Sequence, residues 1–310
     1  MNAYAPVEIA LAAMAVALAA GIFLVGVADR LASRWVAGES LDLGGAIAAP
    51  WRTAALLLSQ SRRTTERPDA PGWALAPALY AGLAAFALAF VPLGPGLVVA
   101  DADTGFVAFS AAIAFVMIAV FLHGWSPNSP LPLIGAYRYG AEALSFQIPF
   151  LLAMLATALP AESLSIVRIV EAQEPLWNVI RQPLGLPLYL VAGLAVSFWG
   201  PLNHPDADDL GGGTSVEDSG VARLLWGGAR AAMLVAMAAM GAAGFLGGWY
   251  GPLLPGPAWM IIKSAALLAL VVLGGHLLAR VRIELFVLVA WAILIPLALL
   301  NVFVSGAFLL

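Results

Sequence analysis

Eight long apolar stretches, separated by shorter polar segments, make up most of this chain. They occupy residues 9–28, 75–93, 105–125, 142–161, 184–200, 223–248, 258–279 and 283–309. Each is close to the length of roughly 20 residues that a helix needs to cross the hydrocarbon core of a bilayer. We therefore predict an all-α fold, a polytopic integral membrane protein with about eight transmembrane helices in a single transmembrane domain over residues 1–310.

The composition agrees with this pattern. Hydrophobic residues make up 62% of the 310 residues and charged residues 10%, and the mean hydropathy is +0.95. A soluble fold of this composition would expose large apolar patches. The chain has no cysteine, so it forms no disulfide and supplies no thiolate to a metal ion or an iron–sulfur cluster. No basic segment precedes residues 9–28, which we therefore expect to be a membrane span and not a cleaved signal.

Positive charge is distributed unevenly between the connecting segments. If the N-terminus lies outside, the external arginines are only Arg168 and Arg181. The internal arginines are then Arg30, Arg34, Arg52, Arg62, Arg63, Arg67, Arg138, Arg223, Arg280 and Arg282. Because juxtamembrane arginine stays in the cytoplasm, we predict a multi-pass protein of the cell (inner) membrane with both termini on the periplasmic or exterior side. The sizeable cytoplasmic loops are then 29–74, 126–141 and 201–222.

The first of these loops contains a further predicted helix. Pro50 suits the first turn of a helix, and the residues after it, 51–58, include a tryptophan and three leucines. An arginine-flanked apolar helix beside a membrane is typical of an interfacial amphipathic helix. The alternative is a solvated connector that happens to contain a few leucines.

Several short motifs lie in the loops and at the ends of the apolar stretches. The second loop reads Trp-Ser-Pro-Asn-Ser at 125–129 and Leu-Ile-Gly-Ala-Tyr-Arg at 133–138. The third reads Pro-Leu-Asn-His-Pro-Asp-Ala-Asp-Asp-Leu at 201–210 and Glu-Asp-Ser-Gly at 217–220. Four further motifs follow along the chain: Phe-Leu-Gly-Gly-Trp at 245–249, Trp259 with Lys263, Arg-Val-Arg-Ile-Glu-Leu at 280–285 and Leu-Ile-Pro-Leu at 294–297. In this order they resemble subunit 1 of respiratory complex I, NADH:quinone oxidoreductase, and the related membrane subunit of membrane-bound group 4 hydrogenases.

The resemblance implies a membrane subunit at the junction of the membrane arm and the cytoplasmic redox arm. Subunits of this family form much of a quinone chamber and the first part of a charged route toward proton-pumping subunits. The expected partners are hydrophilic iron–sulfur and nickel–iron-fold subunits, antiporter-like membrane subunits and the lipid membrane, with no nucleic acid. This chain itself is expected to bind no cofactor except quinone, while iron–sulfur clusters, and nickel–iron in the hydrogenases, belong to the partner subunits.

The chain departs from the family pattern where the resemblance would place intramembrane acids. Family glutamates align with Gln147, Val196 and Arg230, none of which can carry a proton as a carboxylate does. A family arginine aligns with Trp199, and a family lysine of the interfacial helix aligns with Leu56. These differences identify the chain as a divergent member and put the family's proton route in question.

The remaining matched charges are the candidate functional residues. We assign no catalytic residue and no metal site, and we expect the matched residues to line the quinone chamber or to dock partner subunits. They are Arg138, Asp206, Asp208, Glu217, Arg280, Arg282 and Glu284. His204 and the three aspartates after it crowd one short loop and lack a second histidine at helical spacing, so we expect subunit contacts there and not a metal ion. The glycines at 211–213 predict a flexible segment within that loop.

We take Glu142, Arg230 and Lys263 as the intramembrane charges, which need partners because such groups are costly in a membrane. Arg230 and Glu142 are both near the inner side, and we hypothesise that they form an ion pair. The alternative is that Arg230 extends to the interface. For Lys263 extension to the outer interface is the favoured interpretation. The histidines at 123, 204 and 276 are interpreted first as packing residues.

We therefore predict a membrane-anchoring subunit of a complex I-like assembly that couples electron transfer to ion translocation. The first alternative is the anchor of a membrane-bound hydrogenase-type complex in which quinone chemistry or pumping has been lost. Two further alternatives belong to other functional classes: a stand-alone secondary transporter and a purely structural assembly factor. We see no internal repeat of the kind that transporters show.

Overall fold

The computed structural model describes residues 4–307, which form helices and connecting segments with no β-strand. The helices are α1 (Val7–Val36), α2 (Leu43–Ser59), α3 (Ala70–Ala89), α4 (Gly105–Trp125), α5 (Pro130–Ala158), α6 (Ile166–Glu171), α7 (Asn178–Arg181), α8 (Gly185–Val196), α9 (Val221–Phe245), α10 (Gly256–Leu277), α11 (Ile283–Val289) and α12 (Ile295–Ala307). The predicted all-α membrane fold is confirmed.

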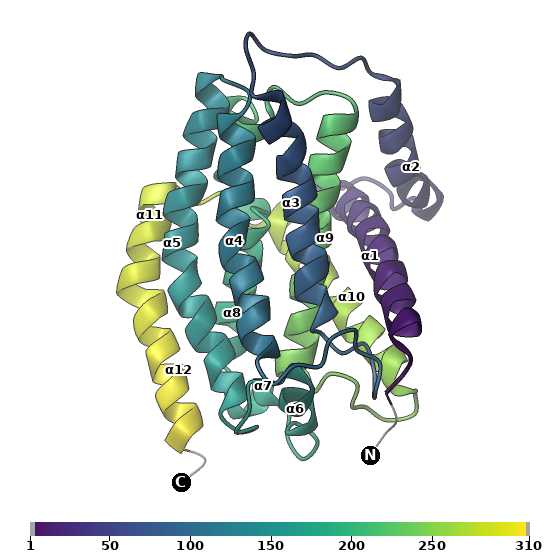
Figure 1. The fold of residues 1–310 in the computed structure, drawn as a ribbon, viewed down its shortest axis with the longest axis vertical. Helices are drawn as coiled ribbons and strands as arrows, with labels where there is room; N and C mark the ends of the chain where they lie inside the picture. Colours follow the sequence, from purple (N-terminus) through teal and green to yellow (C-terminus); the bar gives the residue numbers. More distant parts are fainter. Residues whose placement is uncertain (1–3, 308–310) are drawn as a thin grey trace.

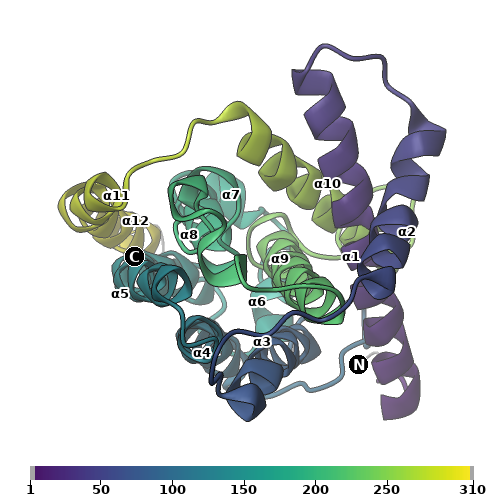
Figure 2. The same ribbon diagram turned by 90° about the horizontal axis from the view of Figure 1, so that it is seen from above.

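The long helices lie side by side along the long axis of the molecule (Figure 1). The start of α1 and the end of α12 are at one end, and α2 and the segment before α9 are at the other. Seen from above, α9 occupies the centre, with α3, α8 and α10 around it (Figure 2). We call the end that carries α2 and residues 197–220 the loop end.

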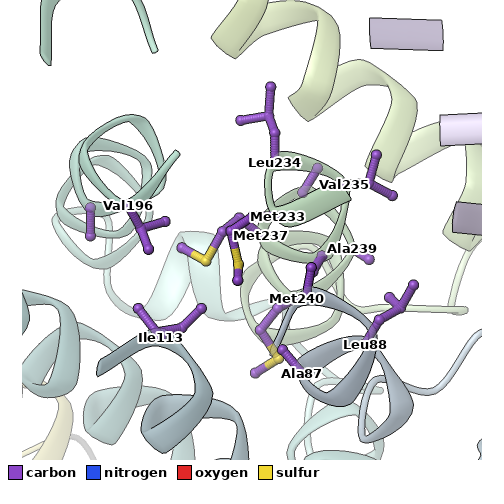
Figure 3. Close-up of a cluster of buried hydrophobic side chains, with 14 of the residues drawn as sticks. Ala87, Leu88, Ile113, Val196, Met233, Leu234, Val235, Met237, Ala239 and Met240 are labelled. Atoms are coloured by element: carbon purple, nitrogen blue, oxygen red, sulfur yellow. The ribbon is translucent and has the colours of Figure 1, made fainter. Parts of the chain in front are cut away.

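The interior is densely packed around α9. Met233, Met237 and Met240 lie at helical spacing and are fully or almost fully buried. Figure 3 shows Met233 and Met237 on the side of α9 that faces Val196 of α8 and Ile113 of α4, and Met240 beside Ala87 of α3. Flexible thioether side chains fill irregular spaces between helices.

Seven of the eight predicted stretches form helices long enough to cross a membrane. The eighth, 184–200, gives α8, which has only 12 residues and is therefore about 18 Å long. Phe198 and Gly200 follow it with positive φ angles of 36° and 56°. These conformations cannot continue a right-handed helix, so the chain leaves the helical path before the predicted end.

Two boundaries differ from the sequence-based expectation because of proline. α5 begins at Pro130, so most of the segment 126–141 that was predicted to be a loop is helical. Proline suits the first position of a helix because its missing N–H would be unpaired there. Pro50, by contrast, lies inside α2, which begins at Leu43 after the N-cap Asp42.

α11 and α12 are joined without a break by a π-helical segment, Ala290–Leu294. Pro296 follows directly in α12. A proline inside a helix removes one hydrogen bond and its ring clashes with the carbonyl group four residues earlier, which accounts for the local widening of the helix. Residues 308 and 309, the end of the eighth predicted stretch, lie outside the described residues.

Candidate functional site: a charged network beneath the loop end

Residues 197–220 fold back into the loop end of the helix bundle. They form short 3-10 turns at Gly200–Leu202, Asp208–Leu210 and Gly213–Ser215. Gly213 has a φ of 52°, and a Cβ atom there would collide with the Pro205 carbonyl oxygen. Gly213 therefore lies in a tight, packed turn, whereas Gly211 is exposed, and the flexibility of the segment stays a prediction.

This fold places Asp206 against Arg230 of α9. The carboxylate Oδ2 lies 3.0 Å from the guanidinium Nη1, and the side chains of Ser215 and Thr214 donate hydrogen bonds to the same carboxylate. Arg230 also donates to the Phe198 carbonyl oxygen at 2.7 Å. With the Ser197 carbonyl oxygen at 3.4 Å from Nε, the arginine has three acceptors inside the protein.

The hypothesised pair between Arg230 and Glu142 was wrong. The acidic loop supplies its own carboxylate, that of Asp206, to Arg230, and Glu142 has a different partner. Sequence spacing on α5 and α9 could not reveal this, because the loop enters the bundle between them. The alternative in which Arg230 extends to the interface is also not observed.

Glu142 contacts His204. Its Oε1 lies 3.1 Å from the His204 Nδ1, and the side chains are 0% and 3% exposed. The other ring nitrogen, Nε2, lies 2.9 Å from the Val281 carbonyl oxygen, so it must donate a proton to that oxygen. In a neutral imidazole Nδ1 would then be an acceptor facing a carboxylate. A proton on either group would relieve the repulsion between these two facing acceptors, although the contact itself falls short of hydrogen-bond geometry.

A third buried pair joins His123 of α4 to Asp218. The distance from Nε2 to Oδ2 is 2.9 Å and neither side chain is exposed. Trp73 donates from Nε1 to the other carboxylate oxygen at 3.0 Å, and the imidazole stacks on Trp226 with the ring centroids 3.6 Å apart. The sequence analysis treated His123 as a packing residue and missed this pair. The acid in the 217–220 motif was the signal that could have indicated it.

Two tyrosines meet near the end of α8. The hydroxyl groups of Tyr80 and Tyr139 donate to the Val196 carbonyl oxygen at 2.7 and 3.0 Å. Val196 is a position where the resemblance implies a glutamate. Here the backbone carbonyl of that residue is the acceptor for both hydroxyl groups.

The outer surface of the loop carries a separate ionic cluster. Asp209 lies 2.8 Å from Arg138 and 2.7 Å from Arg280. The hydrogen bond from Arg138, and next that from Arg280, lower the pKa of Asp209 to about 2, although desolvation opposes them. Two of the candidate docking arginines are thus tied to the loop in the structure.

The other candidate residues lie at the same end without buried partners. Asp208, Arg282 and Glu284 are exposed, and Glu217 accepts a hydrogen bond from Ser129 at 2.8 Å. The loop end therefore has an inner layer of buried pairs and an outer layer of accessible charges.

Lys263 of α10 is at the opposite end of the bundle from this network. Its ammonium donates to the carbonyl oxygens of Leu246, Gly248 and Tyr250 at 2.6, 2.9 and 2.6 Å. These carbonyls follow the C-terminal end of α9, where a cation is favourable. Lys263 is buried, so the favoured interpretation, extension to the outer interface, was wrong.

Comparison with known proteins agrees with the motifs of the loops. Residues 8–306 match the model of the NADH dehydrogenase family. The chain is 33% identical over 246 residues to a protein of Syntrophobacter fumaroxidans (strain DSM 10017 / MPOB) described as a subunit of NADH-quinone oxidoreductase, and the match covers 76% of this chain and 74% of that protein. On this evidence the chain belongs to the NADH dehydrogenase (complex I subunit 1) family of membrane proteins.

Proposed function

We propose that this protein anchors the redox arm of a complex I-like assembly in the membrane and couples electron transfer to ion translocation. The observation that carries the proposal is the charged network between residues 197–220 and the helices α4, α5 and α9. It pairs three carboxylates with cationic or protonatable groups inside the bundle. Buried ionisable groups in membrane proteins commonly belong to ion or substrate paths.

The network joins a surface that can contact partner subunits to the interior of the membrane domain. Asp209 on the outer surface and Asp206 beneath it are three residues apart in the same loop. A partner that moves the outer cluster would therefore act on the buried pairs through a short, rigid connection. We infer that hydrophilic iron–sulfur and nickel–iron-fold subunits dock here.

The quinone assignment rests on family membership and on a cavity of suitable character. An apolar cavity of about 360 Å³ lies between α1, α3, α9 and α10, and its wall includes Val16, Leu24, Leu88 and Met260. Apolar walls suit the tail of a membrane quinone. We propose that partner subunits complete the chamber around the quinone head.

A second candidate function is an anchor that has lost ion translocation. Gln147, Val196 and Arg230 favour it, because these positions carry no carboxylate. In the first candidate the Glu142–His204 pair takes over the proton-carrying role inside α5, about 7 Å along the helix from Gln147. In the second candidate that pair is only structural.

The first test is purification of the tagged full-length chain from its native membrane in mild detergent, with identification of co-purifying proteins and metal analysis. Recovery with iron–sulfur, nickel–iron-fold and antiporter-like subunits is the expected result. Bound nickel would favour a hydrogenase-type complex. Recovery of the chain alone, as a homogeneous and stable particle, would overturn the proposal in favour of an independent transporter.

The second test separates the two candidate functions. The intact complex carrying Glu142→Gln is reconstituted in vesicles, and electron transfer and proton movement are measured together. Loss of proton movement with electron transfer retained supports the proton-carrying role. Equal proton yield per electron in the wild-type complex and the variant would contradict it.

A further inference from the structure

A separate group of arginines lies outside the network, where α1 and α2 meet at the loop end. A pocket of about 260 Å³ is lined by Arg30 and Arg34 of α1, by Arg52 of α2, and by Asp42, Gly45, Ala49 and Thr53. Figures 1 and 2 both show α1 and α2 side by side at this end. None of these arginines was among the candidate site residues.

Close packing of the two helices brings the positive charges together. A Cβ atom on Gly26 would lie 2.9 Å from the Pro50 ring, and the rings of Phe23 and Trp51 are 5.7 Å apart. Arg30 and Arg34 are four residues apart and so project from the same side of α1. The contact is thus apolar along its length and cationic at its loop end.

The positive charge in the pocket is only partly neutralised. Arg34 lies 3.3 Å from Glu39 and 3.5 Å from Asp42. Within the described part of the chain, neither Arg30 nor Arg52 has a carboxylate within 4.0 Å. With three arginines against two acids, the group keeps an excess of positive charge.

Arg34 already contacts carboxylates of its own chain. Asp42 is the N-cap of α2 and accepts a hydrogen bond from the Gly45 amide at 3.0 Å. This bond, with smaller contributions from the charges of Arg34 and Arg52, holds the pKa of Asp42 below its ordinary value although desolvation opposes it. Asp42 thus lies beside Arg34, while Arg30 and Arg52, which have no carboxylate within 4.0 Å among the described residues, remain available to a ligand. Two guanidinium groups match the oxygens of a phosphate group.

We propose that this pocket binds the phosphodiester of an anionic phospholipid at the loop-end surface of the membrane. A lipid is favoured over soluble phosphate because apolar side chains continue below the arginines. Trp51 and Leu24 are exposed beside the contact between the helices, and tryptophan is typical of the headgroup level of a bilayer. Ile47, Leu56 and Leu58 are also exposed on α2, as expected for a helix whose outer face contacts lipid.

The test uses the full-length protein in detergent, stripped of lipid and titrated with phosphatidylglycerol or phosphatidylcholine, with bound lipid counted by native mass spectrometry. We expect preferential binding of phosphatidylglycerol. Arg30→Gln and Arg52→Gln should each weaken it about fivefold, since one arginine near a membrane surface contributes about 1 kcal/mol of attraction to anionic lipid. Arg63→Gln, an exposed arginine outside the pocket, is the matched control and should have no effect.

Asp42→Asn should change the binding of phosphatidylglycerol in the opposite direction. Asparagine keeps the N-cap of α2 but frees Arg34, so phosphatidylglycerol should bind more tightly. Equal binding by the wild-type protein and the two arginine variants, or equal binding of both lipids, would overturn the proposal. Displacement of the lipid by equimolar inorganic phosphate would also overturn it, because the site would then recognise phosphate without the lipid.

Discussion

The two charged regions at the loop end, the buried network and the α1–α2 pocket, satisfy their charges differently. In the network, Asp206, Asp218 and Glu142 each have a partner from a different segment of the chain. In the pocket, Arg30 and Arg52 are exposed and have no carboxylate partner among the described residues. A buried charge must be paired within the protein, whereas an exposed arginine can keep its capacity to bind an external anion.

The largest loss of stability is expected when one member of a buried pair is removed. Arg230→Met should destabilise the protein by about 3–5 kcal/mol, because it leaves Asp206 as an uncompensated buried charge. Thermal unfolding of the purified chain would measure the change. In the double variant Arg230→Met with Asp206→Leu a large part of the stability should return. A double variant as unstable as the single one would show that the pair does not couple the loop to α9.

The tight turn offers a backbone test of the same region. Gly213→Ala should cost about 2 kcal/mol or more, because the position has a positive φ and no room for a Cβ atom beside Pro205. Gly140→Ala is the matched control. Gly140 lies inside α5 with nothing within 4 Å of an added Cβ, so alanine there should stabilise the helix by about 0.5–1 kcal/mol. The free energy of unfolding measures both changes.

Substitutions of Glu142 sharpen the comparison by testing whether Glu142 and His204 share a proton. Glu142→Gln should cost only about 1 kcal/mol, since an amide N–H can donate to a neutral His204. Glu142→Leu should cost more, about 1–3 kcal/mol, because it removes the acidic group that faces the buried Nδ1. The chain has three histidines, so the protonation of each ring can be followed by nitrogen NMR of the histidine-labelled protein. A His204 signal that is identical in the wild-type protein and Glu142→Gln would contradict a shared proton.

The smallest effect is expected at the outer ionic cluster. The pKa of Asp209 is about 2 in the folded protein against about 3.9 for an ordinary aspartate. A carboxyl group whose pKa is lowered in the folded protein stabilises the fold at pH values above its ordinary pKa. This contribution is lost as the pH falls from about 4 to about 2. Because the Asp209 side chain is 45% exposed, solvent limits the contribution to less than about 1 kcal/mol. Stability curves of wild type and Asp209→Asn should differ above pH 4 and converge toward pH 2.

The long spans were predictable because an apolar stretch in a membrane has few alternatives to a helix. The predicted stretch 105–125 coincides with α4. The start of α5 and the interior position of Pro50 were not predictable from proline alone, because proline is tolerated at several places in a helix that has tertiary support.

The pairing of charges was the part that the sequence could not provide. Asp206 meets Arg230 across 24 residues and Asp218 meets His123 across 95. Both contacts depend on how residues 197–220 turn back into the bundle, and that path is set by positive φ angles at a few glycines. Local pattern shows which residues are charged, but the tertiary path of the loop decides which of them meet.

The shortness of α8 also has a consequence for how the protein enters the membrane. A helix about 18 Å long falls well short of a hydrocarbon core of about 30 Å, and the chain after it is irregular. Non-helical backbone at that depth is tolerated only when other protein segments shield it from lipid. We therefore expect α8 to be a poor insertion signal alone and to settle in the bilayer only after α9 and α10 have been synthesised, so that truncation before α9 would leave α8 outside the membrane.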